Sequence, residues 1–227
     1  MDKLVIDKAL KKRGIALSDP NKITLNSYNR YANEYIRNTV PTIAQSPLQM
    51  REWIDTALGA IPQDGVVFEI GSATIRDASY MRQQGYKVIC SDATESFIEI
   101  MLAAGEPAVH FNVLEDKLAD QYHMIYANGV FPHFTVEEIQ LALQNIHSSL
   151  KPEGILAFSI KQGMGEEWIK EKLEDVRFAH YWSQQDITDV LNEEGFSLQY
   201  TSFNTGLYPS HRWLNIICKK EARNRRK

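Results

Sequence analysis

The sequence predicts an α/β fold, a mostly parallel sheet with helices on both faces, and three observations predict it. Apolar, β-rich runs alternate with helical patterns from Val66 to Ile160. The first run, Val66–Phe68, is apolar at every position, as in a strand that is buried on both faces. Two further β-rich runs, Phe196–Phe203 and Trp213–Cys218, predict a terminal strand pair.

A strand–helix–strand unit opens this region. The first strand ends in a turn of small residues, Glu69–Thr74, and a helix suits Asp77–Gln84. A second strand suits Tyr86–Cys90, and Asp92 follows at its end, where ligands of open parallel sheets bind. A carboxylate there can accept both hydroxyl hydrogens of a ribose. The unit therefore predicts nucleoside binding, although any α/β protein with a strand–turn–helix start shares the pattern.

The sequence disfavours one common type of nucleotide site, the dinucleotide site, and excludes another, the P-loop. The dinucleotide fingerprint needs a third glycine where the helix packs closely on its strand, and Arg76 occupies that position. The chain contains no Gly-Lys-Ser/Thr sequence, which excludes a P-loop.

What remains resembles the first motif of the class I S-adenosylmethionine-dependent methyltransferases. That motif has an acidic residue, one further residue and a small-residue loop, with a second acid at the end of the next strand. Glu69, Gly71 and Asp92 match it. Ala73 and Ile75 stand where the family has its second and third glycines. Alanine suits its position if φ is negative, whereas a β-branched residue takes a positive φ only at a cost.

A second segment is similar to the same family. Asn128–Phe134 follows the fourth predicted strand and carries His133 just before a capping box, Thr135–Glu138. The helix behind it ends in a Leu-Lys-Pro-x-Gly turn, Leu150–Gly154. Two such segments at the expected separation identify the chain as a member of this family.

The resemblance implies a fold, a cofactor and a set of site residues. The fold is a Rossmann-like sheet of seven strands, mostly parallel with the last strand antiparallel, so residues 66–70 and 154–160 should share one sheet. The cofactor is S-adenosyl-L-methionine, and the helix predicted over Asn26–Val40 should lie across it. The implied cofactor-binding residues are Tyr28, Tyr35, Glu69, Gly71, Ser72, Ala73, Asp92, Ala93, Phe97, Asn112, Val113, Ala127 and Asn128.

Several of these residues also have purely structural explanations. Tyr28, Tyr31 and Tyr35 recur at helical spacing and could simply pack a helix onto the core. Phe97 could be a core aromatic, and an asparagine after the third strand could form a turn. His133 is the candidate general base, but a histidine beside a capping box can also satisfy backbone groups.

Residues 161–182 are the least regular part of the core region. Lys161, Gly163 and Gly165 predict a mobile connection, and aromatic residues cluster before Ser183. In this family an insert after the fifth strand often forms a wall of the substrate pocket. A solvated loop with a packed aromatic end is the alternative.

Composition and charge limit the expected binding partners and the expected cellular compartment. A formal net charge of −4 argues against a nucleic-acid partner. With no apolar run long enough to span a membrane and no signal peptide, we expect a cytoplasmic protein without a membrane partner. Cys90 and Cys218 fall in predicted strands and should be buried thiols. No ligand spacing of His, Cys or carboxylates appears, so no metal is expected.

The expected organisation is a helical cap or lid in residues 1–60, a methyltransferase domain in 61–220 and a disordered basic tail in 221–227. The predicted function is transfer of a methyl group to a small-molecule acceptor by in-line displacement, which depends mainly on proximity and orientation. One alternative is a non-catalytic or cofactor-binding relative that acts through interactions, and another is a methyltransferase with a macromolecular substrate. The acceptor, the methylated atom and the oligomeric state stay open.

Overall fold

The structure is a computed structural model and describes residues 19–170, 172–205 and 212–222. The first part of the predicted cap, residues 1–18, and the predicted tail from residue 223 lie outside the described residues. The helices are α2 (Pro20–Arg37), η1 (Ile43–Gln45), α3 (Leu48–Gly59), α4 (Arg76–Gln83), α5 (Glu95–Ala103), η2 (Phe131–His133), α6 (Val136–Ser149) and α7 (Gln184–Glu193). The strands are β1 (Val66–Ile70), β2 (Lys87–Asp92), β3 (Ala108–His110), β4 (Tyr122–Asn128), β5 (Leu150–Gln162), β6 (Gly165–Ile169), β7 (Arg177–Trp182), β8 (Phe196–Asn204) and β9 (Trp213–Lys220).

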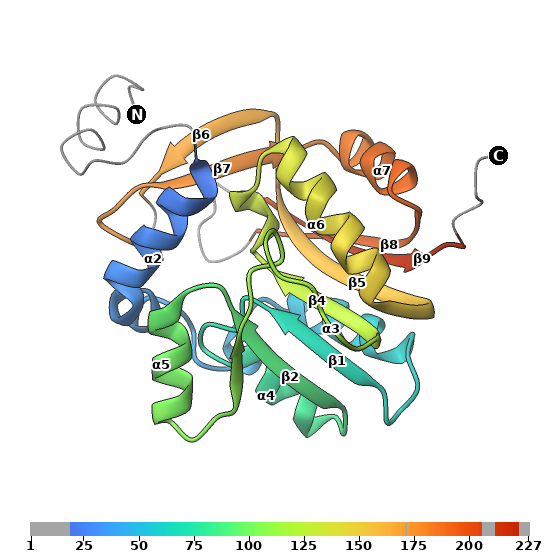
Figure 1. The fold of residues 1–227 in the computed structure, drawn as a ribbon, viewed down its shortest axis with the longest axis horizontal. Helices are drawn as coiled ribbons and strands as arrows, with labels where there is room; N and C mark the ends of the chain where they lie inside the picture. Colours follow the sequence, from blue (N-terminus) through green and yellow to red (C-terminus); the bar gives the residue numbers. More distant parts are fainter. Residues whose placement is uncertain (1–18, 171, 206–211, 223–227) are drawn as a thin grey trace.

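Five parallel strands form the centre of the sheet in the order β3–β2–β1–β4–β5 (Figure 1). Strand β9 continues the sheet antiparallel to β5, with Leu156 opposite Cys218, and β8 pairs antiparallel with β9. The predicted mostly parallel sheet with an antiparallel last strand is confirmed, and β1 and β5 lie in it together. These seven strands follow the predicted arrangement, and β6 and β7 extend the sheet to nine strands. The carboxyl ends of the parallel strands meet at one edge, where ligands of such sheets bind.

The segment after β5 differs from the prediction of a mobile connection. It forms an antiparallel hairpin, β6–β7, and β7 pairs in parallel with the end of β5 at Lys161 and Gln162. The ring centroids of Trp168 and Phe178, which lie opposite each other in the hairpin, are 5.7 Å apart. Runs of five or six residues are too short to show a clear period, so the sequence pattern does not reveal this pairing.

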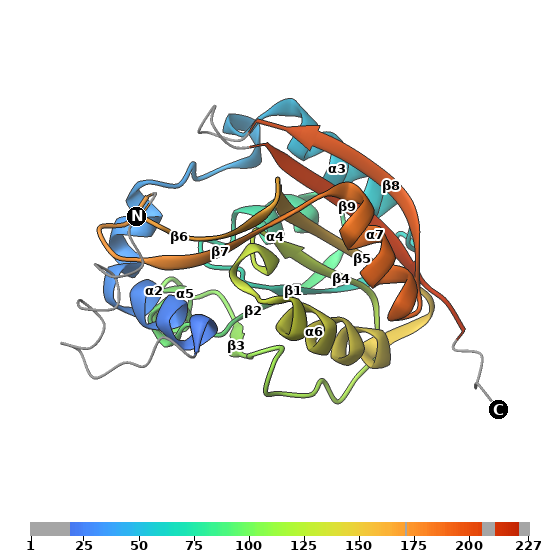
Figure 2. The ribbon, with the colours of Figure 1, turned by 90° about the horizontal axis from the view of Figure 1, so that it is seen from above.

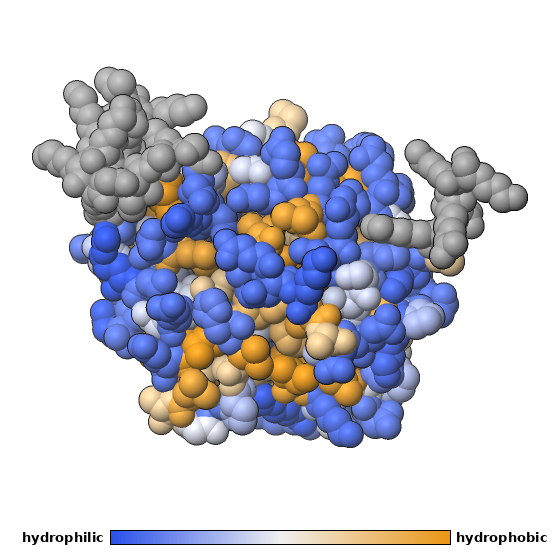
Figure 3. All heavy atoms as spheres, viewed as in Figure 1, coloured by the Kyte–Doolittle hydropathy of each residue, from blue (hydrophilic) through white to orange (hydrophobic). Residues whose placement is uncertain are grey.

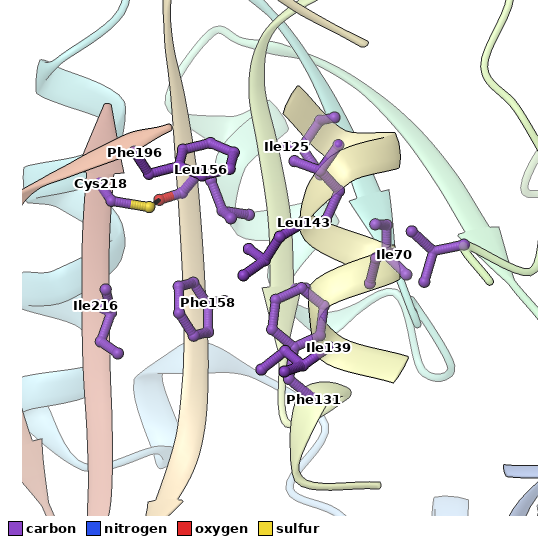
Figure 4. Packing of buried hydrophobic residues seen from close by; sticks show 14 of the residues in the cluster. Ile70, Ile125, Phe131, Ile139, Leu143, Leu156, Phe158, Phe196, Ile216 and Cys218 are labelled. Atoms are coloured by element: carbon purple, nitrogen blue, oxygen red, sulfur yellow. Dashed lines mark hydrogen bonds between the residues drawn. The ribbon is translucent and has the colours of Figure 1, made fainter. Parts of the chain in front are cut away.

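Helices cover both faces of the sheet, and the sheet separates the hydrophobic core into two clusters, one on each face (Figure 2). Helices α6 and α7 pack on one face, where Ile139 and Leu143 of α6 point toward Ile125 and Phe158 of the sheet (Figure 4). Helices α3, α4 and α5 pack on the other face, where Trp53 of α3 is fully buried. Burial on both faces explains the continuous apolar character of β1 and β4.

Within the described residues, no helix covers the part of the sheet formed by β2 and β3 on the α6 face. Ile89 of β2 and Val109 of β3 are exposed on this face. Their neighbours in the chain, Val88, Cys90 and Ala108, point to the opposite face and pack in the core cluster there. Figure 3 shows an apolar region over the part of the molecule that holds β2 and β3, within a mostly polar surface.

Helix α2 begins earlier than the predicted start at Asn26. Asp19 caps it by accepting a hydrogen bond from the backbone amide of Lys22 at 2.9 Å, and Pro20 occupies its first turn. The sequence Asp19-Pro20-Asn21 is therefore the start of this helix. Tyr31 has non-helical backbone angles, φ −118° and ψ 23°, which mark a kink in the helix.

Candidate functional site

Two adjoining pockets lie at the carboxyl edge of the sheet. The β2-side pocket is lined by residues that follow β2 and β3, among them Asp92, Phe97 and Asn112. The β5-side pocket is lined by residues at the ends of β1, β4, β5 and β9 and in the β6–β7 hairpin. The residues common to both linings are Tyr28, Tyr35, Gly71, Ala73, Asn128, Gly129 and His133. A ligand in one pocket can therefore meet a ligand in the other.

The turn after β1 is joined to the end of β2. The amide of Ala73 donates to Oδ2 of Asp92 at 3.1 Å, and the amide of Thr94 donates to Oδ1 at 2.9 Å. A carboxylate has about four lone-pair sites, so acceptor capacity remains on Asp92 for a ligand. Burial raises the pKa of Asp92 to about 6. Asp92 is therefore largely ionised at neutral pH.

Three residues of this turn have positive φ: Gly71 at 75°, Ala73 at 41° and Ile75 at 53°. A Cβ atom at Gly71 would lie 2.5 Å from Cγ2 of Val130, so only glycine fits there. The negative φ with which alanine would suit this position is not the one that Ala73 adopts. The turn keeps the backbone that glycines would adopt, at a cost of about 1–2 kcal/mol for each non-glycine residue. The hydrogen bond from the amide of Ile75 to the carbonyl of Ser72, at 2.8 Å, supports this conformation.

Aromatic rings from two elements line the β2-side pocket. Tyr28 and Tyr35 of α2 lie 5.4 Å apart between ring centroids, and their centroids lie 6.0 and 5.5 Å from that of Phe97 in α5. Tyr31 lines neither pocket, because the kink interrupts the helical face that the spacing predicted.

Asn112 and Val113 lie beside Phe97 in the same pocket, as does Ala93. Asn112 also forms a turn, because its Oδ1 accepts a hydrogen bond from the amide of Leu114 at 3.1 Å. Its Nδ2 group keeps a donor for the pocket.

Ala127 is the predicted site residue that the fold places elsewhere. It is fully buried in the core under α6 and lines neither pocket. Successive side chains of a strand point to opposite faces, so Ala127 turns into the core and Asn128, the next residue, reaches the site.

Glu69 and Ser72 line the β5-side pocket and not the β2-side pocket. The hydroxyl of Ser72 donates to Oε2 of Glu69 at 2.6 Å. Burial, and then the charge of Asp77, raise the pKa of Glu69 to about 8, so the protonated carboxyl predominates at neutral pH. Asp77 itself lies 2.6 Å from Nε of Arg76 and accepts hydrogen bonds from Tyr126 and Asn128.

Most residues that line the β5-side pocket were not among the predicted site residues. Lys161, at the carboxyl end of β5, and Arg177, in β7, are both buried and both line this pocket. The position of Lys161 near the carboxyl end of β5 was a usable signal, because ligands of parallel sheets bind at that edge, as the position of Asp92 indicated for β2.

His133 is held by hydrogen bonds on both ring nitrogens. Its Nδ1 lies 2.6 Å from the carbonyl oxygen of Phe178, which can only accept, so Nδ1 carries the hydrogen. Its Nε2 therefore accepts from the hydroxyl of Tyr28 at 2.8 Å. Burial, and then the charge of Arg177, lower the pKa of His133 to about 3. The ring is neutral at physiological pH.

Helix α2 and strand β7 lie beside each other and close one side of the site (Figures 1 and 2). The hydroxyl of Ser27 donates to the carbonyl of Val176 at 2.6 Å, and the amide of Phe178 donates to Thr24 at 3.0 Å. Arg30 forms an ion pair with Asp175 at 3.0 Å. The inserted hairpin and the N-terminal helix thus form one wall.

Three further observations concern the part of the chain that the structure describes. No group of three His, Cys, Asp or Glu side chains there could hold a metal ion. None of the helices built from those residues is long and apolar enough to cross a membrane. Cys90 and Cys218 are free and buried, as predicted.

The sheet, the glycine turn and Asp92 define an α/β protein with two adjoining pockets at the edge where such folds bind their ligands. A family model described as a methyltransferase domain matches residues 43–201. The chain belongs to this methyltransferase family, which confirms the class I methyltransferase resemblance of its two motifs.

Individual relatives agree with this assignment. An uncharacterized methyltransferase of Alkaliphilus oremlandii is 24% identical over 214 residues, covering 84% of this chain and 94% of the relative. The 1,6-didemethyltoxoflavin-N1-methyltransferase of Burkholderia thailandensis, solved with 1,6-didemethyltoxoflavin and S-adenosylhomocysteine, has a TM-score of 0.70 at 17% identity, over 91% of this chain and 92% of that one. DhpI, solved with SAH, has a TM-score of 0.67 at 16% identity, over 92% of this chain and all of the other. At these identities the solved structures show a shared fold.

Proposed function

We propose that the chain transfers a methyl group to a small-molecule acceptor by in-line displacement. S-adenosylmethionine is the cofactor, and when bound it supplies a methyl group on an activated sulfonium. The observation that carries the proposal is the continuity of the two pockets through Tyr28, Gly71, Asn128 and His133. A donor in the β2-side pocket and an acceptor in the β5-side pocket would meet at these residues.

The residues of the β2-side pocket fit a nucleoside. Asp92 offers ionised acceptors for ribose hydroxyls, Phe97 offers an aromatic face for the base, and Asn112 offers a donor. Gly71 lines both pockets, so its backbone lies at their junction. Ala93 and Val113 complete the lining beside the base.

The chain contributes mainly orientation. Holding two reactants in line can supply roughly 7–11 kcal/mol of a barrier, and a general base is needed only for some acceptors. With a pKa of about 3 and with its Nε2 occupied by Tyr28, His133 is a weak base at neutral pH. We therefore assign His133 the role of holding Tyr28 at the junction of the pockets.

Tyr28 and Tyr35 line both pockets and cover their junction. Both rings come from α2, so within the cap predicted for residues 1–60 this helix is the part that covers the site. Helix α3 instead packs on the sheet face that α4 and α5 also cover. Aromatic rings next to a sulfonium can stabilise its charge by about 0.5–2 kcal/mol each.

Two properties support a small acceptor in a cytoplasmic setting. The Burkholderia methyltransferase with a similar fold is named with the small molecule 1,6-didemethyltoxoflavin bound. Two free, buried thiols suit a reducing compartment.

Titration calorimetry with S-adenosylmethionine and S-adenosylhomocysteine tests the proposal. We expect saturable binding of both, and a screen of metabolite pools with radiolabelled donor should then identify the acceptor. Failure to bind either compound at millimolar concentration would refute the proposal that the chain is an active methyltransferase. Binding without transfer to any pool would favour the non-catalytic relative.

A further inference from the structure

A row of polar side chains crosses four adjacent strands near the carboxyl edge of the sheet. Each member lies opposite the next in the strand register, in the order Asn128 of β4, Ser159 of β5, Asn215 of β9 and Ser202 of β8. The members from β4, β5 and β9 line the β5-side pocket. The next row on the same face, Tyr126, Ala157 and Ile217, belongs to a hydrophobic core cluster. The polar row therefore marks where the core ends and the pocket begins.

Hydrogen bonds within the protein orient the β4 and β5 members of this row. The hydroxyl of Ser159 donates to Oδ1 of Asn128 at 2.7 Å and accepts from the amide of Gly129 at 2.9 Å. Nδ2 of Asn128 donates to Oδ2 of Asp77 at 2.7 Å. These bonds fix the orientation of both side chains, so this side of the pocket is preorganised.

The amide group of Asn215 retains hydrogen-bonding capacity. Among the described residues, its Nδ2 donates to the hydroxyl of Ser202 at 3.2 Å, and its Oδ1 accepts from Nδ2 of Asn204 at 3.1 Å. A side-chain amide has two N–H hydrogens and two acceptor lone pairs, so one of each remains. Asn215 is only 1% exposed and has little access to bulk water. A ligand in the pocket that Asn215 lines could use both groups.

The indole ring of Trp213 lies between Asn215 and the junction of the two pockets. Trp213 and Asn215 are two residues apart on β9, so their side chains share a face of the sheet, and both line the β5-side pocket. A Cβ atom at Gly129 would lie 3.5 Å from the Trp213 ring. Gly129 lines both pockets. An aromatic surface thus extends from the Asn215 amide toward the place where donor and acceptor would meet.

We propose that the methyl acceptor is a flat, uncharged ring compound with an amide edge, an N–H beside a carbonyl as in a lactam. Asn215 binds this edge, and Trp213 packs against the ring. This inference rests on the proposed function, because it places the acceptor next to the donor site.

The hydrogen-bonding pattern of Asn215 is the reason for an amide edge. A lactam offers one donor and one acceptor side by side, which matches the one acceptor and one donor that Asn215 retains. A carboxylate only accepts and an ammonium group only donates, so either would leave half of a buried amide unpaired. The indole ring of Trp213 favours a flat, aromatic partner.

Calorimetry on protein already saturated with S-adenosylhomocysteine tests the acceptor pocket separately from the cofactor site. The probes are isoquinolin-1-one, a flat lactam, and isocoumarin, the lactone of the same shape in which oxygen replaces the N–H. A flat anion, 1-naphthoate, is the third probe.

Three variants accompany the probes. Asn215→Leu keeps the approximate size of the side chain without its hydrogen bonds, and Trp213→Leu removes the indole. The matched control is Asn192→Leu, at an exposed position of α7 outside both pocket linings.

We expect isoquinolin-1-one to bind more tightly than isocoumarin by about five- to a hundredfold, the factor that follows when a buried polar group loses its partner. Asn215→Leu should remove this preference, whereas Asn192→Leu and the wild type should behave alike. Trp213→Leu should weaken both probes by about two- to tenfold and keep the preference between them. Affinity for S-adenosylhomocysteine should be unchanged in Asn215→Leu, because Asn215 does not line the β2-side pocket.

Several results would overturn the inference. Equal affinity for lactam and lactone, or no binding of isoquinolin-1-one at millimolar concentration, would remove the amide site. Tighter binding of 1-naphthoate than of the lactam would indicate an anionic acceptor instead. An intact preference in a folded Asn215→Leu protein would remove Asn215 from the site, and unchanged affinities in Trp213→Leu would remove Trp213.

Two controls complete the experiment. A wild-type protein that fails to bind S-adenosylhomocysteine would refute the proposed function itself, before any probe is added. Circular dichroism of Asn215→Leu checks its fold, and Asn215→Ala serves as the second variant if the first is unfolded.

Discussion

The hydroxyl of Tyr28 lies 2.8 Å from Nε2 of His133 and joins helix α2 to the segment that follows β4. The same hydroxyl accepts a hydrogen bond from Arg177 in the inserted hairpin. One phenol oxygen thus connects the three elements that surround the junction of the two pockets.

Removing this hydroxyl should destabilise the protein. Tyr28→Phe leaves His133 without its donor and takes an acceptor from Arg177 in a buried site, which should lower the free energy of unfolding by about 1–3 kcal/mol. Urea unfolding measures the change. The matched control is Tyr31→Phe on the same helix, since Tyr31 lies outside both pockets. Equal losses in the two variants would mean that the Tyr28 contacts contribute nothing specific.

Asp92 should control cofactor affinity. Asp92→Ala removes a charged acceptor worth about 1.5–3 kcal/mol, so affinity for S-adenosylhomocysteine should fall about ten- to a hundredfold. Calorimetry measures the affinity, circular dichroism checks the fold, and Asp120→Ala in an exposed loop is the control. Unchanged affinity in a folded Asp92→Ala protein would exclude Asp92 from the site.

The pKa of Asp92 also predicts a pH dependence. Because burial raises this pKa to about 6, the carboxyl gains a proton and loses acceptor capacity as the pH falls through 6. Affinity for S-adenosylhomocysteine should therefore decrease from pH 7 to pH 5, and the decrease should be absent in Asp92→Ala. The same slope in both proteins would assign the titration to another group.

The strained turn offers a stabilising substitution. Ala73 has a φ of 41°, so Ala73→Gly should relieve about 1–2 kcal/mol of left-handed strain and lose part of this through the more flexible unfolded chain. The net gain in the free energy of unfolding should be about 0.5–1 kcal/mol. Ala103→Gly, at an exposed helical position of α5, should instead destabilise by a similar amount. Destabilisation by both would show that the Ala73 backbone is unstrained.

Hydrogen exchange tests whether α2 acts as a lid. If α2 closes over bound cofactor, residues 20–40 should gain protection when S-adenosylhomocysteine is added, because a segment that opens is drawn from the less stable part of a fold. Residues 172–182 should gain protection together with them, since Ser27 and Thr24 bond to that segment. Residues 154–160, in the centre of the sheet, should be slow throughout. Equal exchange of residues 20–40 with and without ligand would make their tyrosines simple core packing.

The sequence by itself determined the class of fold and the nucleoside half of the site. Alternating strands and helices, Gly71 and Asp92 are local signals, because a buried strand, a tight turn and the residue after a strand each depend on neighbours in the chain. The sequence determined helix starts less accurately. The predicted helix began at Asn26, whereas α2 begins at Pro20, because Asp19 caps it. The turn sequence did not reveal that Ala73 adopts a positive φ, since the neighbouring Asp92 holds its amide.

Only the tertiary structure decided the other half of the site. The β6–β7 hairpin brings Arg177 beside Tyr28, 149 residues earlier in the chain, and pairs β7 with the end of β5 at Lys161. The orientation of a strand decides which of two consecutive residues faces the pocket, as with Ala127 and Asn128. The state of His133 likewise depends on the distant partners Tyr28 and Phe178. Contacts of this kind depend on the packing of distant segments, and no local pattern of residue types encodes them.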